Sequence, residues 1–144
     1  MDDLRFVGTL NEVPALRTRF QADLRASGVE SEELEGWALC FTELVNNALE
    51  HGCSAAGDRV RVGWGETHGR ILVTVTNPGV GCISKEDFDV SDCDDFAETG
   101  RGAGLFIIRA WADEIRVHAR DGVTEVEVSR RRESPPLATS GGER

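Results

Sequence analysis

The first part of the chain shows a short alternating segment followed by apolar residues at helical spacing. Residues 4–10 alternate weakly and are predicted to form an edge strand. Asn11 is expected to cap the next helix, with Pro14 in its first turn and Gly28 just after its end. The positions of that helix expected to face the core are Val13, Leu16, Phe20 and Leu24.

A second helix is predicted from Ser31 to about His51, and it has two different faces. At about 100° per residue, Asn46, Asn47 and Glu50 fall within roughly 60° of Glu43. The opposite face is apolar and comprises Leu34, Trp37, Phe41, Leu44, Val45, Ala48 and Leu49. From this helix alone, the polar stripe fits a functional surface and an ordinary solvated face equally well.

Four later segments alternate in the manner of strands and pair into two predicted hairpins. Residues 59–64 and 70–77 are expected to form the first hairpin, joined across Gly65–Gly69. Residues 114–118 and 124–128 are expected to form the second, because Asp121-Gly122 favours a tight primed turn. Trp37, Trp64 and Trp111 all fall at periodic apolar positions, which predicts packing in the core or at a dimer interface.

Residues 78–104 interrupt this regularity, being rich in glycine and aspartate and showing little periodicity. Such a long segment within a domain is typical of a lid or binding element. A helix is predicted after it, over residues 103–113. The resulting order of elements predicts an α/β two-layer sandwich, with a mostly antiparallel sheet and the helices on one face. We expect one domain over residues 1–130 and a flexible tail over residues 131–144.

Composition narrows the classes of function. A formal net charge of -10 argues against nucleic acid as a partner, because that binding needs clustered basic residues. No apolar run approaches the roughly 18 residues of a membrane span, and the acidic start differs from a secretory signal, so we expect a cytoplasmic protein. The four cysteines form no CxxC pair and are interpreted as free thiols. A metal site at His51 and Cys53 is disfavoured because no second ligand pair follows.

Three segments carry candidate chemistry. On the polar stripe, Glu43 can act as a general base and Asn47, one turn later, can offer an oxygen to Mg²⁺. In residues 77–81, Asn-Pro-Gly-Val-Gly follows a strand, and its glycines allow close backbone approach to a ligand, although a simple turn fits as well. In residues 100–104, Gly-Arg-Gly-Ala-Gly opens a helix, whose N-terminal N–H groups suit an anion, and Arg101 adds positive charge.

In this order, the three segments resemble the nucleotide-binding signature of the ATPase superfamily that contains gyrase, heat-shock chaperone and histidine-kinase catalytic domains. The core from Phe6 to Val128 looks most like the anti-sigma-factor serine kinases of bacterial partner-switching systems. The resemblance lies in FTELVNNALEHG, VTNPGVG and GRGAGLFIIRAWADEI. It implies a Bergerat-type fold that binds ATP with Mg²⁺.

The resemblance also implies a role for each matching residue. Glu43 corresponds to the catalytic base. Asn47 corresponds to the residue that binds the Mg²⁺ ion of the nucleotide. The adenine would lie against Asn77, Gly79 and Gly81. The phosphates would lie against Arg101, Gly102, Ala103 and Gly104. The family normally has aspartate where this chain has Asn77, and a neutral acceptor weakens that hydrogen bond by about 1 kcal/mol.

The expected function is that of an ATP-dependent protein serine kinase. It would phosphorylate a small anti-sigma-factor antagonist protein and sequester a partner such as a sigma factor, and the resemblance suggests a homodimer through the first strand. The alternative is a non-catalytic nucleotide-binding module that acts by sequestration alone, which Asn77 keeps open. The catalytic half of a histidine kinase is disfavoured, because His51, His68 and His118 do not lie in a phosphoacceptor helical hairpin.

Overall fold

The computed structural model describes residues 3–51, 59–79, 84–89 and 102–133. The first half contains β1 (Asp3–Val7), η1 (Leu10–Glu12), α1 (Val13–Ala26), α2 (Ser31–His51) and β2 (Val60–Thr67). The second half contains β3 (Arg70–Pro78), α3 (Lys85–Asp89), α5 (Gly102–Trp111), β4 (Glu114–Arg120) and β5 (Val123–Arg131). The predicted order of strands and long helices is therefore confirmed.

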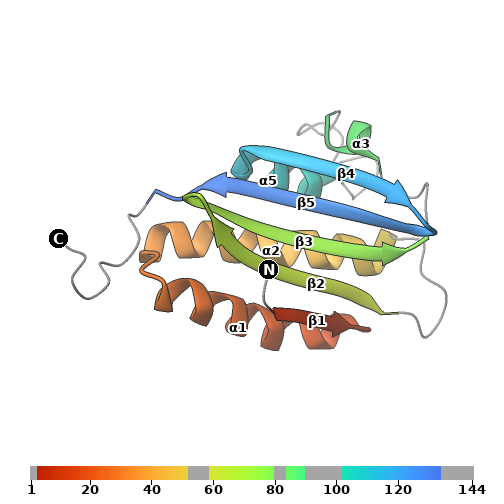
Figure 1. Ribbon diagram of the computed structural model, residues 1–144. Helices are drawn as coiled ribbons and strands as arrows, with labels where there is room; N and C mark the ends of the chain where they lie inside the picture. Colours follow the sequence, from red (N-terminus) through yellow and green to blue (C-terminus); the bar gives the residue numbers. More distant parts are fainter. Residues whose placement is uncertain (1–2, 52–58, 80–83, 90–101, 134–144) are drawn as a thin grey trace.

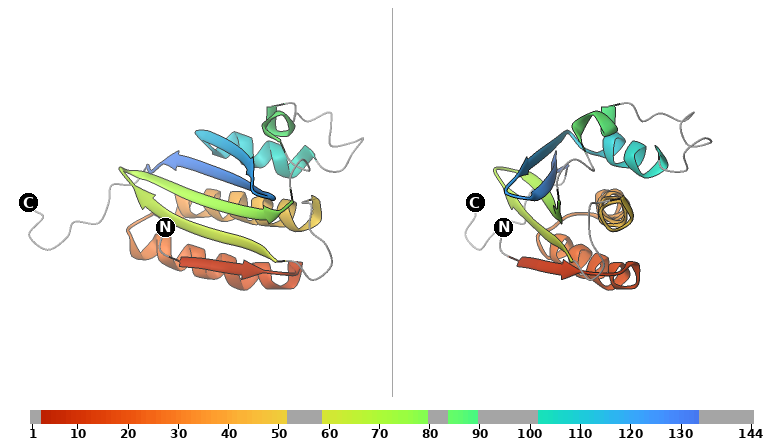
Figure 2. Two further views of the ribbon diagram at one scale, coloured as in Figure 1. Left: turned by 45° about the vertical axis from the view of Figure 1, so that its right-hand side comes forward. Right: turned by 90° about the vertical axis from the view of Figure 1, so that its right-hand side faces the viewer.

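The strands form one five-stranded sheet in the order β1-β2-β3-β5-β4 (Figure 1). Every neighbouring pair is antiparallel. Figure 2 shows α1, α2 and α5 on the same side of the sheet, with the other face uncovered by helices. The predicted two-layer α/β sandwich is confirmed. No helix in the described ranges combines the length and apolar character needed to cross a membrane.

Both hairpins turn through two residues with positive φ. The pairs are His68-Gly69, with φ of 53° and 78°, and Asp121-Gly122, with φ of 54° and 80°. Two left-handed residues in succession define the primed turn that suits the twist of paired strands. The turn at Asp121-Gly122 was predicted. The first hairpin turns more tightly than predicted, because β2 continues to Thr67 and β3 begins at Arg70.

The core lies between the sheet and the apolar side of α2. Phe20, Trp37, Phe41 and Trp64 form an aromatic cluster with ring centroids 4.3–6.0 Å apart. The indole Nε1 of Trp64 donates a hydrogen bond to Asp23 Oδ2 at 2.9 Å. The expectation of core packing is confirmed for Trp37 and Trp64, which are 0% and 5% exposed.

The start of the first helix differs from the prediction. Asn11 lies inside the short 3-10 helix η1, so the prediction that it caps the helix is wrong. The carboxylate of Glu12 accepts the N–H groups of Gly8 and Thr9, at 2.6 and 3.1 Å, and so satisfies backbone donors before the helix. Pro14 lies in the first turn of α1, as predicted.

The segment predicted to be a lid or binding element contains a short helix. In α3, the side chain of Asp87 accepts the backbone N–H of Ser84 at 2.9 Å, and Phe88 is 1% exposed within the core cluster. One buried aromatic side chain thus fixes a segment that has no apolar periodicity. The remainder of the predicted lid, residues 80–83 and 90–101, lies outside the described residues.

The packed chain continues past the predicted domain boundary at residue 130. Arg132 Nη1 binds Glu66 Oε1 at 2.7 Å, and its Nη2 donates to the carbonyl of Ser27 at 3.0 Å. The backbone N–H of Glu133 donates to Glu33 Oε2 at 2.9 Å. Arg132 and Glu133, two residues of the predicted tail, therefore join the end of β5 to the α1–α2 junction and to β2. Residues 134–144 lie outside the described residues.

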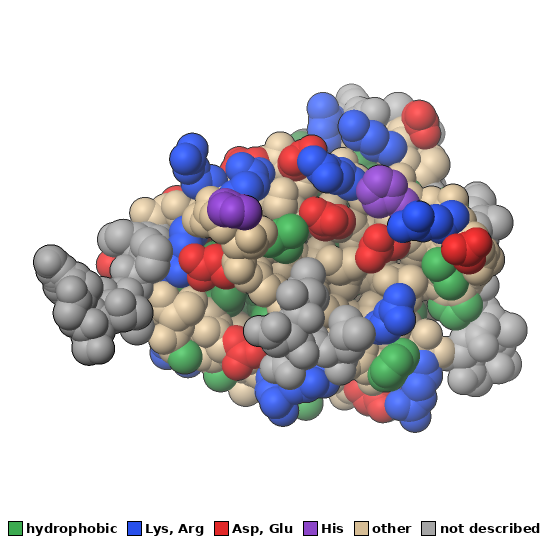
Figure 3. All heavy atoms as spheres, in the orientation of Figure 1, with side chains coloured by type: hydrophobic (Ala, Val, Ile, Leu, Met, Phe, Trp, Pro, Cys, Tyr) green, Lys and Arg blue, Asp and Glu red, His purple; other side chains and the backbone are tan. Residues whose placement is uncertain are grey.

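The outer face of the sheet carries charges of both signs, interspersed over the surface that Figure 3 shows. On the edge strand β4, Arg116 Nε binds Glu114 Oε2 at 2.9 Å. An edge strand with mixed charges is poorly suited to pairing with the edge of another sheet.

Helices α2 and α5 approach closely at Gly36. A Cβ atom added there would lie 2.3 Å from the Trp111 ring. A face of that ring is covered by Arg130, whose guanidinium carbon is 3.6 Å from the ring centroid. Arg130 Nη1 also donates to the Trp111 carbonyl at 3.1 Å. Trp111 is thus held between a glycine and a cation, which leaves the indole little room to move.

We expect Gly36→Ala to lower the free energy of unfolding by about 1–3 kcal/mol, because the new methyl group overlaps a rigid indole. Urea denaturation measures this change. In a Trp111→Ala background the overlap is gone, so the same substitution should stabilise the protein by about 0.5–1 kcal/mol through helix propensity. A loss of stability of equal size in both backgrounds would contradict this explanation.

Candidate functional site

Glu43 and Gly104, predicted to be the base and part of the phosphate loop, lie against each other. A Cβ atom added at Gly104 would be 2.8 Å from Glu43 Oε1, so the carboxylate occupies the space that a side chain would fill. Gly104 lies in the first turn of α5, where backbone N–H groups lack partners within the helix and the helix dipole is positive. The polar stripe of α2 therefore faces the N-terminal end of α5.

Glu43 is partly buried, and this changes its acidity. Burial raises the pKa of its carboxyl group above the usual range, and the nearby carboxylate of Glu50 raises it further. A carboxylate with a raised pKa holds an accepted proton more readily at neutral pH. The environment of Glu43 therefore suits a general base.

The rest of the stripe separates into buried and exposed positions. Asn47, one turn after Glu43, is only 8% exposed, whereas Glu50 is exposed and Asn46 is half-buried. A plain solvated face would not bury an asparagine in this way. Glu43 and Asn47 together supply a carboxylate and a carboxamide oxygen, the ligand types that Mg²⁺ prefers.

Asn77 occupies the end of β3 and is 1% exposed. It follows the buried residues Val73 and Val75 in alternation, which places its side chain on the helix-covered face. Neither Asn77 Oδ1 nor Nδ2 has a hydrogen-bond partner among the described residues. Buried polar groups in proteins are rarely left in this state, so the amide fits a site that a ligand completes.

Gly79 and Thr124 extend the site beyond Asn77. Thr124 pairs with Asn77 across β3 and β5, and its hydroxyl donates to the Gly79 carbonyl at 2.7 Å. The Gly79 N–H donates to the carbonyl of Gly122 at 2.6 Å, and its φ of 102° favours glycine. Thr124 was not among the site residues predicted from the sequence. The available signal was its place in the alternation with Val126 and Val128, which puts a hydroxyl on the buried face of β5.

The remaining predicted residues are described only in part. Gly102 begins α5, and Ala103 follows it in the same turn. Gly81 and Arg101 lie outside the described residues. Their assignment to the adenine and the phosphates stays a prediction.

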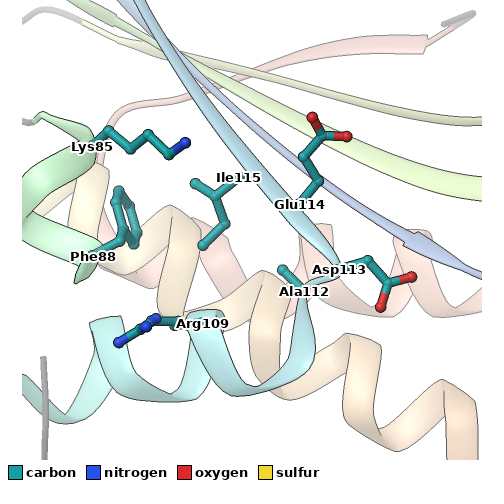
Figure 4. A pocket seen from close by; sticks show the side chains of 7 residues that line it. All are labelled: Lys85, Phe88, Arg109, Ala112, Asp113, Glu114 and Ile115. Atoms are coloured by element: carbon teal, nitrogen blue, oxygen red, sulfur yellow. The ribbon is translucent and has the colours of Figure 1, made fainter.

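A separate cavity of about 280 Å³ lies between α3, α5 and β4 (Figure 4). Lys85, Phe88 and Arg109 line it from the two helices, and Ile115 and Glu114 line it from β4. None of the predicted nucleotide-binding residues that the structure describes lines this cavity. The candidate site is therefore built on the Glu43–Gly104 contact, with Asn47 on the same stripe of α2 and Asn77 at the end of β3, and not on this hollow.

Comparison with known structures supports the fold. One similar structure is that of the SiaB–SiaC complex from Pseudomonas aeruginosa, with a TM-score of 0.66 and 12% identity over 90% of this chain and 89% of that chain. Another is that of the RsbU and RsbW domains of Rv1364c from Mycobacterium tuberculosis, with a TM-score of 0.63 and 18% identity. The second match covers 92% of this chain but only 32% of that longer chain.

Comparison at the level of sequence gives the family. No curated protein matches the chain significantly. The model of the histidine kinase-like ATPase domain, however, matches residues 6–130, a range that includes the Glu43 stripe, the end of β3 and the start of α5. The chain therefore belongs to the histidine kinase-like ATPase domain family.

Proposed function

We propose that this protein is an ATP-dependent serine kinase that regulates a partner protein in the cytoplasm. The observation that carries the proposal is the contact between Glu43 and Gly104. It brings a carboxylate with a raised pKa to the helix terminus where an anion is best bound. A phosphate held there and a hydroxyl beside Glu43 would be neighbours, as phosphoryl transfer requires.

In the proposed reaction, a serine oxygen of the partner protein forms a bond to the γ-phosphorus of ATP. The bond between that phosphorus and the β,γ-bridging oxygen breaks, ADP leaves, and the serine proton passes to a Glu43 carboxylate oxygen. Asn47 would hold Mg²⁺, which when bound neutralises charge on the phosphate oxygens. The raised pKa of Glu43 favours proton acceptance at neutral pH.

Other residues would position the nucleotide. Asn77 offers a buried, unsatisfied amide for the base, and the Gly79 backbone beside it is fixed by Thr124. Gly81 completes the proposed adenine contacts, and residues Arg101, Gly102, Ala103 and Gly104 complete the proposed phosphate contacts.

The proposed protein substrate is a small antagonist protein with an acceptor serine, and a sigma factor is the proposed sequestered partner. The similar SiaB–SiaC structure is itself a complex of two proteins. A homodimer through β1 is also proposed, since β1 is an edge strand and Phe6 on it is 58% exposed.

A non-catalytic module that binds nucleotide and acts by sequestration is the second candidate, and Asn77 is the residue that favours it. A neutral amide in place of a carboxylate weakens one anchor of the base. Transfer of labelled γ-phosphate to the antagonist protein separates the two candidates. Labelled antagonist supports the kinase, whereas nucleotide binding without transfer supports the module.

Calorimetry tests nucleotide binding itself. We expect ATP with Mg²⁺ to bind the full chain at one site, and removal of Mg²⁺ by a chelator to weaken binding by about tenfold or more, since the phosphate charge is no longer neutralised. The matched control is Asn47→Ala, which should show a smaller response to the chelator. Absence of measurable heat at millimolar ATP would overturn the proposed function.

A further inference from the structure

The side chain of Asn77 is buried with both its donor and its acceptor unsatisfied. It is 1% exposed, and neither Nδ2 nor Oδ1 has a partner among the described residues. Leaving such a group unpaired is costly, so a ligand that fits must present an acceptor and a donor side by side. A ligand that supplies only one of the two would leave half of the amide unsatisfied.

No contact within the described part of the chain fixes which way the amide points. Its neighbour across the sheet, Thr124, donates its hydroxyl hydrogen to the carbonyl of Gly79 instead. The terminal torsion of asparagine is broad and roughly two-fold, so a half-turn exchanges the positions of Oδ1 and Nδ2. The pocket can therefore present donor and acceptor in either order.

Purine bases carry the matching pair of groups on one edge. Adenine presents the N6 amino donor beside the N1 acceptor, and a 6-oxopurine presents the O6 acceptor beside the N1–H donor. A carboxylate has only acceptors and cannot pair with both groups of either edge. An asparagine amide can form two hydrogen bonds to either edge after a half-turn.

We propose that Asn77 makes the nucleotide site accept 6-amino and 6-oxopurine nucleotides with similar affinity. This rests on the proposed function, because it requires that the base lies against Asn77. Base selection in this protein then comes from an amide that adapts to its ligand. The predicted ligand class is purine nucleotides with either substituent at position 6.

Calorimetric titration of the full chain with three triphosphates tests the proposal. ATP, inosine triphosphate and purine riboside triphosphate have the same sugar and phosphates and differ only at the base edge. We expect the dissociation constants of the first two to agree within about tenfold. Purine riboside triphosphate, which lacks the group at position 6, should bind about three- to tenfold more weakly than ATP. Inosine triphosphate binding more than tenfold more weakly than ATP would overturn the proposal.

The variant Asn77→Leu removes both polar atoms and keeps the branched shape of the side chain. The three nucleotides should then bind with affinities within about threefold of one another, because residue 77 no longer has a polar group that can hydrogen-bond to the base edge. A persistent preference for ATP in this variant would mean that another residue recognises the base edge, and would overturn the proposal.

The wild-type comparison needs no variant, so it stands even if Asn77→Leu folds poorly. If no triphosphate binds the wild-type protein, the proposed function fails, whereas ATP binding with rejection of inosine triphosphate refutes only this inference.

Discussion

Glu43→Gln is expected to lower the rate of phosphoryl transfer by a factor of about 10²–10⁴, the usual contribution of a general base. Glutamine keeps the shape of the side chain but cannot take up the serine proton. Nucleotide affinity should stay within about threefold of the wild-type value, because the proposed contacts to the base and the phosphates come from other groups. Transfer of labelled γ-phosphate to the antagonist protein measures the rate, and calorimetry measures the affinity.

Glu50→Gln is the matched control, since Glu50 lies on the same stripe of α2 but is exposed. It should transfer phosphate at a rate close to that of the wild-type protein. Equal rates for wild type and Glu43→Gln would show that the base has been misassigned.

Glu43→Gln lowers the rate of transfer, but it is expected to raise the stability of the folded protein above neutral pH. Because the folded protein raises the pKa of Glu43, it favours the protonated carboxyl group and loses stability as the pH rises through that pKa. Glutamine does not ionise, so Glu43→Gln should be more stable than wild type at pH 8, and the difference should disappear in acid. Urea denaturation at pH 8 and at about pH 4, near the ordinary glutamate pKa, measures this.

Gly104→Ala is expected to impair transfer by about ten- to a hundredfold without weakening the fold. The added methyl group would lie 2.8 Å from Glu43 Oε1, the end of a flexible side chain, so the carboxylate is displaced rather than the helix. Misplacing a catalytic group by about 1 Å can cost about a hundredfold in rate. The free energy of unfolding should be unchanged or rise by up to about 1 kcal/mol, because alanine is the better helix former.

A double variant shows whether the two residues act together. If Gly104→Ala works by displacing Glu43, then Glu43→Gln combined with Gly104→Ala should transfer phosphate no more slowly than Glu43→Gln alone. Fully additive losses would mean that Gly104 acts on the phosphates independently. Gly36→Ala is the structural counterpart, because there the neighbour is a rigid indole and stability falls instead.

Periodicity predicted the parts of this fold that depend on neighbours in sequence. The inward face of α2 and the turn at Asp121-Gly122 follow from helical spacing and turn chemistry, and both are observed. Asn11 failed as a cap because the chain already turns helically as η1 over Leu10–Glu12, so Asn11 lies inside a helical turn and not in front of one. Helix α3 packs against the core through one buried residue, Phe88. A single apolar position forms no periodic pattern, so the sequence did not predict this helix.

The site could be predicted by residue type but not by geometry. The sequence places Glu43 on the polar side of a helix, but the Glu43–Gly104 contact exists only because α5 packs against α2. Likewise, the spacing of β3 does not show that Asn77 is buried without a partner, since that depends on what β5 offers across the sheet. The alternation of β5 could have placed Thr124 on the buried face, but its bond to Gly79 depends on how β5 pairs with β3.

The bonds of Arg132 and Glu133 also affect how the protein can fold during synthesis. They join these residues to Ser27 and Glu33 across sequence separations of 105 and 100 residues. A ribosome adds about 5–20 residues per second. The residues of the α1–α2 junction are therefore synthesised several seconds before Arg132 and Glu133, the residues that bond to them. The nascent chain can form the α1 and α2 helices early, but this corner of the domain closes only after β5 has left the ribosome.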